Sequence, residues 1–167
     1  MVYCHTLILY IERMVIIMSA KLIELDAVLR IYEQNFRNLH WNSKGLEFND
    51  SHKNITTEYY EMLSDDVDKI AEILAVLGVD PFNYLEAAEY ITKSETKYFI
   101  VDSHAHYNKL EICKFADIML NDICNILAAA IEELDQPINA GIKSELETLL
   151  YNYTLQAKYL NKRRLEE

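Results

Sequence analysis

Apolar residues recur along the chain in steps of three and four, the spacing of one face of an α-helix. The first such stripe comprises Leu22, Leu25, Leu29, Tyr32, Phe36 and Leu39. The second comprises Ile55, Tyr59, Met62, Ile70, Leu74 and Leu77. Gly78 and Pro81 follow the second stripe, as expected just beyond a helix C-terminus. The pattern predicts two long helices, one from about Ala20 to the low forties and one ending near Leu77, joined by a polar turn around Gly45.

The second half of the chain repeats this periodicity. A third helix is predicted from about Asp102 to Leu134, with an apolar stripe of Leu110, Cys113, Leu120, Cys124, Leu127, Ile131 and Leu134. A fourth helix has Pro137 in its first turn and Asp135 as a capping candidate. Its apolar face comprises Ile142, Leu146, Leu149, Tyr153, Ala157 and Leu160.

The connection from Val79 to Val101 is too long for two adjacent antiparallel helices, and its segment 84–91 could form a short helix. We therefore expect an all-α protein, a ferritin-like four-helix bundle with a short helix in a long crossover between the second and third helices. With only 3 Gly and 2 Pro in 167 residues, the composition also favours a few long helices over many short strands.

The chain carries 16 Lys and Arg against 27 Asp and Glu, a formal net charge of −11. This balance argues against coating nucleic acid or an anionic membrane with the whole surface, and it suits a protein that attracts cations. Cys4, Cys113 and Cys124 are odd in number and lack CxxC spacing. A disulfide framework is therefore not expected, and a cytoplasmic location is the simplest inference.

The first 18 residues are apolar but contain Glu12 and Arg13. They fall short of the roughly 20 apolar residues of a membrane span and lack the basic region and cleavage site of a signal peptide. Two interpretations are open. Residues 1–17 are an extension or a mis-assigned start preceding a domain of residues 18–167, or they form an additional amphipathic helix.

Two of the five histidines, His40 and His52, bracket the turn around Gly45. Asp68 and Glu72 share one helix face at i, i+4 spacing, and Glu61 and Asp65 extend this acidic stripe. Mixed imidazole and carboxylate ligation suits iron. The simpler alternative is a solvated acidic face beside a polar turn.

These residues resemble the motif of the Dps proteins, the bacterial mini-ferritins. In that motif a His-Trp pair ends the first helix, a glycine turn, a Phe and a second His follow, and an Asp-x-x-x-Glu pair lies further along. The matching residues are His40-Trp41, Gly45, Phe48, His52, Asp68, Glu72 and the helix-ending Gly78. The resemblance extends from Leu22 to Gly78. The combination of these motif elements is specific for the family, whereas each element alone is weak evidence.

The resemblance implies a ferroxidase that oxidises Fe(II), preferably with hydrogen peroxide, and stores ferric iron inside a shell of twelve subunits. Such chemistry protects against oxidative stress. His40 and His52 of one chain would face Asp68 and Glu72 of another at a two-fold interface, and Trp41 would lie beside the iron. The Glu-x-x-His motif of other di-iron bundles is absent from the sequence.

Two features depart from the family pattern. The interval from His52 to Asp68 is one residue longer, and an extra residue in a continuous α-helix would rotate all later side chains of that helix by about 100°. Three outcomes are open: the second helix starts later, a one-residue bulge absorbs the insertion, or His52 is displaced. Thr56 and Thr57 also stand where the family often has an acidic ligand, with Glu58 close but not equivalent.

Two alternative functions remain at this point. One is a Dps-like shell that mainly binds and compacts DNA, although Lys21 and the terminal Lys162, Arg163 and Arg164 offer few basic residues. DNA binding is therefore expected to be weak or absent. The other is a structural bundle with a degenerate metal site. His104 and His106 are expected to have ordinary surface or packing roles, and the alternative is that they line a pore or bind metal.

Overall fold

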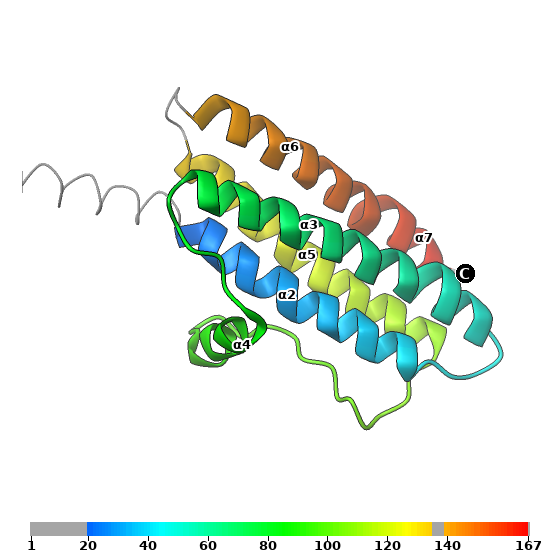
Figure 1. Ribbon diagram of the computed structural model, residues 1–167. Helices are drawn as coiled ribbons and strands as arrows, with labels where there is room; N and C mark the ends of the chain where they lie inside the picture. The colour runs from blue at the N-terminus through cyan, green and yellow to red at the C-terminus, as the bar shows by residue number, and fades with distance from the viewer. Residues whose placement is uncertain (1–19, 135–138, 167) are drawn as a thin grey trace, which may run out of the picture.

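Four long helices lie side by side in the computed structural model, which describes residues 20–134 and 139–166 (Figure 1). In chain order the elements are α2 (Ala20–Trp41), the π-helical η1 (Asp50–Thr56), α3 (Thr57–Val76), α4 (Tyr84–Lys93), α5 (Lys109–Glu133), α6 (Ala140–Leu155), the π-helical η3 (Gln156–Leu160) and α7 (Asn161–Glu166). The proposed domain start at residue 18, with the extension before it, lies outside the described residues. Asp135 and Pro137, the expected start of the fourth helix, also lie outside them.

The predicted apolar stripes form the core. All six residues of the first stripe are buried on α2, with at most 1% of any side chain exposed. Along η1 and α3 the buried series is Ile55, Tyr59, Leu63, Val67, Ile70 and Leu74. Leu63 thus takes the place that the sequence assigned to Met62, which is only partly buried. In the described part of the chain, no helix has the length and apolar character needed to cross a bilayer.

The short helix predicted in the crossover is α4, and it packs against α2 (Figure 1). Asn83 caps it, accepting hydrogen bonds from the backbone N–H groups of Leu85 and Glu86. The Glu86 carboxylate accepts one from the backbone of Asn83 in return. This reciprocal capping box sets where the helix begins.

The predicted start of the third helix at Asp102 is wrong, because α5 begins at Lys109. Asn108 and Glu111 form a capping box at that point. The residues before it pair instead with the turn after α2: Tyr107 N–H donates to Asn42 O at 2.9 Å, and Lys44 N–H donates to Tyr107 O at 2.8 Å. Leu110, assigned to the apolar stripe, lies in the first turn of α5 and is 48% exposed.

Polar side chains of α2 fasten the crossover to the bundle. The buried Asn35 donates to Phe99 O at 2.8 Å and accepts from Val101 N–H at 3.2 Å. Asp26 accepts from the backbone N–H of Phe82 at 2.8 Å.

Tyrosine hydroxyls also bind carboxylates in four pairs: Tyr98 with Glu24, Tyr84 with Glu33, Tyr32 with Asp122 and Tyr153 with Asp66. The apolar pattern did not predict these buried polar residues.

We expect Asn35→Leu to lower the free energy of unfolding by about 1–3 kcal/mol, because it leaves the partly buried carbonyl of Phe99 and the buried N–H of Val101 without their side-chain partner. The matched control is Asn152→Leu, at an exposed position on α6, with an expected effect within about 0.5 kcal/mol. Urea unfolding followed by circular dichroism measures both. Equal losses in the two variants would contradict the fastening role of Asn35.

Candidate metal centre

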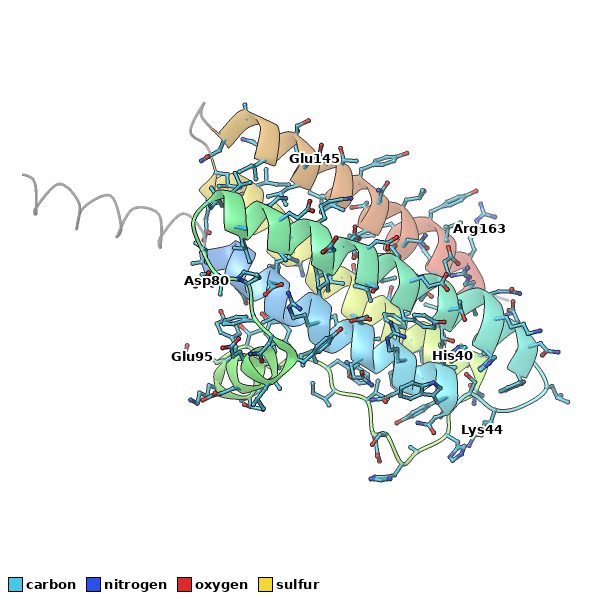
Figure 2. The ribbon with its side chains drawn as sticks, in the orientation of Figure 1. His40, Lys44, Asp80, Glu95, Glu145 and Arg163 are labelled. Atoms are coloured by element: carbon cyan, nitrogen blue, oxygen red, sulfur yellow. The ribbon has the colours of Figure 1, made fainter. Side chains whose placement is uncertain are left out.

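His40 and His52 form a stacked pair at one end of the bundle. His40 lies at the end of α2, next to the turn that carries Lys44 (Figure 2), and His52 lies in η1. Their ring centroids are 3.6 Å apart and their planes differ by 20°. The structure thus brings together the two histidines that the sequence placed on either side of the turn.

Each histidine is bound to the backbone of the other. His40 Nδ1 lies 2.8 Å from His52 O, and His52 Nδ1 lies 2.9 Å from His40 O. Because a carbonyl oxygen only accepts hydrogen bonds, each Nδ1 must carry the hydrogen. In a neutral imidazole this leaves the lone pair on Nε2, the arrangement in which histidine binds a metal through that atom.

Burial lowers the pKa of His40 below its ordinary value. The hydrogen bond to the His52 backbone opposes this shift in part, and the charges of His52 and Arg37 add to it. His40 therefore stays neutral to a lower pH than free imidazole, which favours metal binding because the protonated ring cannot act as a ligand. Neither Nε2 has a hydrogen bond to another described residue.

Two aromatic rings flank the histidine pair. Phe48 stacks on His52 with centroids 4.9 Å apart, and Tyr60 meets His40 edge-on at 5.4 Å. The Arg37 guanidinium lies 4.6 Å from the centre of the Tyr60 ring. Phe48 was recognised in the sequence, but Tyr60 was not, because its contact with His40 spans twenty residues. Trp41 is 63% exposed, and its placement beside iron remains a prediction.

A π-helical turn accommodates the longer interval between His52 and Asp68. Of the three outcomes left open, the local widening is the one observed: η1 covers Asp50–Thr56, and α3 continues from Thr57 as a regular helix. His52 stacks on His40, and its place relative to a metal stays a prediction. Glu58 turns towards the last helix and pairs with Arg164 at 2.8 Å.

Asp68 and Glu72 are exposed on α3, as are Glu61 and Asp65 of the same stripe. At about 1.5 Å per residue, Asp68 lies roughly 16 Å along the helix from Thr57, where the histidine pair contacts α3. Among residues 20–134 and 139–166, no group of three or more His, Cys, Asp and Glu side chains could hold a metal. One chain therefore keeps the predicted imidazole and carboxylate ligands apart.

An open hollow of about 580 Å³ lies beside Asp68. Its lining comprises Arg30, Ser64, Asp65, Val67, Asp68 and Ala71. Arg30 is paired with the buried Asp26 at 3.0 Å, which neutralises much of its charge. The hollow therefore offers two exposed carboxylates on a surface that is accessible in the single chain.

The remaining candidates have other environments. His104 and His106 are exposed in the loop before α5, while Cys113 and Cys124 are buried in the core, as the sequence predicts. Asp66, which the acidic stripe did not include, is buried and accepts a hydrogen bond from Tyr153 at 2.8 Å. Burial raises the pKa of its carboxyl group.

Known proteins resemble this chain in sequence over about half of its length. Over 79 residues it is 38% identical to a DNA protection during starvation protein of Helicobacter pylori, which covers 46% of this chain and 53% of that protein. An uncharacterized protein of Haemophilus influenzae is 35% identical over 88 residues, 53% of each chain. Each match thus spans about half the relative's length. No family model matches the chain.

Solved structures match nearly the whole chain. A Dps protein from Bacillus brevis superposes with a TM-score of 0.79 at 17% identity, covering 92% of this chain and 97% of the other. A Dps protein from Vibrio cholerae, described as a member of a broad superfamily of ferritin-like diiron-carboxylate proteins, gives 0.77 at 17% identity over 90% of each chain. The fold is therefore the predicted ferritin-like four-helix bundle with a short helix in its crossover. The sequence match and this fold together confirm the resemblance to the Dps family.

Proposed function

We propose that the protein oxidises Fe(II), preferably with hydrogen peroxide, and stores the ferric product inside a shell of twelve chains. The observation that carries this proposal is the histidine pair, which presents two Nε2 atoms without hydrogen-bond partners in the described structure. The Dps-like fold supports it, because the sequence places the same motif residues in that fold. Iron is the substrate, and its oxidation by peroxide would limit hydroxyl-radical formation and so protect against oxidative damage.

In the proposed site, His40 and His52 of one chain and Asp68 and Glu72 of a second chain bind the iron. The separation of these two groups within one chain supports a shared site, and the exposure of both carboxylates leaves them accessible to a second copy. The imidazoles would hold Fe(II), whereas the carboxylates would stabilise the harder Fe(III) product.

The direct test loads the protein anaerobically with Fe(II), adds peroxide and follows the ferric absorbance. We expect the double variant His40→Ala, Asp68→Ala to oxidise iron no faster than peroxide oxidises Fe(II) without protein. The matched control is His104→Ala, Asp80→Ala, which changes the same residue types at exposed positions; Asp80 lies at the far end of the bundle from His40 (Figure 2). Equal rates in wild type and the first variant would contradict the site. Sedimentation as a single 19.6 kDa chain would contradict the shell.

We expect no DNA gel shift at about 0.15 M salt, because basic residues are few and screened at that ionic strength. Of the three terminal basic residues, Arg164 is engaged with Glu58 and Tyr59, which leaves Lys162 and Arg163 exposed. Any shift at low salt should disappear in Lys162→Ala, Arg163→Ala. A shift that persists at physiological salt would favour the DNA-compacting alternative.

A further inference from the structure

The π-helical turn η1 changes where the threonine hydroxyls point. Thr57 donates to His52 O at 2.8 Å, five residues back. The Thr56 hydroxyl lies within donating distance of Ser51 O at 2.9 Å, five residues back, and of His52 O at 3.1 Å. In a regular helix a threonine hydroxyl reaches three or four residues back, as Thr148 does to Ser144 O at 3.0 Å. The extra residue therefore places two hydroxyls against the backbone of His52.

Three oxygen atoms surround His40 Nδ1 as a result. They are His52 O at 2.8 Å, Thr56 Oγ1 at 3.2 Å and Thr57 Oγ1 at 3.3 Å. A hydroxyl that donates to a carbonyl oxygen keeps lone pairs on its own oxygen, so all three atoms can accept a hydrogen bond from an Nδ1–H group. A lone pair on Nδ1 would face only other lone pairs, and the ring is stable here only with its hydrogen on Nδ1.

We propose that Thr56 and Thr57, placed by the π-helical turn, are positioning residues that hold His40 as the Nδ1–H tautomer and keep the Nε2 lone pair available for a metal ion. The extra residue that lengthens the interval between His52 and Asp68 thus places the hydroxyls that orient His40. This inference rests on the proposed function only for the identity of the metal. Its structural content, one fixed tautomer, concerns the metal-free chain.

The double variant Thr56→Val, Thr57→Val tests the role, because valine preserves the shape of threonine while removing both hydroxyls. Thr56→Ser, Thr57→Ser restores the hydroxyls and should restore the wild-type behaviour. The matched control is Thr92→Val, Thr148→Val, which removes two exposed helical hydroxyls that bind local carbonyls. A role limited to helix stability would not distinguish tautomers, so the decisive measurement is spectroscopic.

Solid-state ¹⁵N NMR of the full-length, metal-free protein labelled at histidine separates protonated from unprotonated ring nitrogens. The His40 signals are assigned by their loss in His40→Ala. We expect a single Nδ1–H tautomer for His40 in wild type, in the serine variant and in the control. In the valine variant the His52 carbonyl loses the two hydroxyls that hold it against His40 Nδ1. We therefore expect mixed tautomers and an anaerobic Fe(II) affinity that is lower by about tenfold, the lower end of the effect of losing a hydrogen-bond partner of a metal ligand.

A single Nδ1–H tautomer in the valine variant would overturn the positioning role, as would a valine-like spectrum in the serine variant. Failure of the proposed function gives a different result: wild type would bind no Fe(II), whatever the state of its imidazoles. The NMR signals decide the positioning role, and iron binding by wild type decides the proposed function.

Discussion

When chains with His40→Ala and chains with Asp68→Ala are co-expressed in equal amounts, the mixed assemblies should oxidise iron at about one quarter of the wild-type rate. Neither variant should reach this rate alone. The rate of each variant alone should fall at least about tenfold. Even the loss of a residue that only hydrogen-bonds a metal ligand lowers metal affinity or activity by about 10- to 100-fold. In the proposed site at a two-fold interface, the histidines would come from one chain and the carboxylates from the other. On random mixing, about one site in four combines an intact histidine pair with an intact carboxylate pair.

The pairing of His40 and His52 within one chain provides a sharp control. Their rings stack at 3.6 Å, so both imidazoles of a proposed site would come from the same chain. Co-expression of His40→Ala with His52→Ala can therefore never assemble an intact site, and no recovery is expected. Equal recovery in the two mixtures, or none in the first, would contradict a site shared between chains. The measurement is the ferric absorbance after peroxide addition to purified mixed assemblies.

The stripe on α2 was predictable because burial follows a local repeat. Every predicted apolar position from Leu22 to Leu39 lies in the core, since a long helix with one apolar face packs in only one orientation. The short helix α4 was predictable for a similar reason. Its capping signals at Asn83 and Glu86 lie within four residues of each other.

The start of α5 was not predictable from local pattern. The segment from Asp102 to Tyr107 has no helix breaker, but its backbone pairs with the turn after α2 some sixty residues earlier. The buried carboxylates of α2 show the same limitation. Asp26 and Glu33 resemble surface residues in the sequence, yet Phe82 N–H and the Tyr84 hydroxyl reach them from the crossover.

The candidate site was predictable as a set of residues but not as an arrangement. The sequence identified the two histidines and two carboxylates, and it left three outcomes open for the extra residue before Asp68. Which of these outcomes the chain adopts depends on a contact across the turn. The His52 carbonyl accepts a hydrogen bond from His40, and this bond forms only when both helices are in place. Whether a second chain completes the site is a property of the assembly, which the periodicity of one chain does not contain.

Leu39→Ala should reduce the free energy of unfolding by about 2–5 kcal/mol, a large part of the roughly 5–15 kcal/mol available to a domain. Leu39 is fully buried at the last turn of α2, directly before His40. Truncating it removes apolar contacts and leaves a cavity that the surrounding helices fill only partly. The loss is measured by urea unfolding of the variant and wild type at the same protein concentration.

Leu85→Ala is the matched control, because Leu85 is 79% exposed on α4 and its loss should change stability by no more than about 0.5 kcal/mol. Leu39→Met nearly preserves the side-chain volume and should cost less than about 1.5 kcal/mol. Equal effects of Leu39→Ala and Leu85→Ala would contradict the packing described for α2. Because Leu39 supports the turn that carries His40, Leu39→Ala should also weaken Fe(II) binding at temperatures where the variant remains folded, whereas Leu39→Met should bind normally.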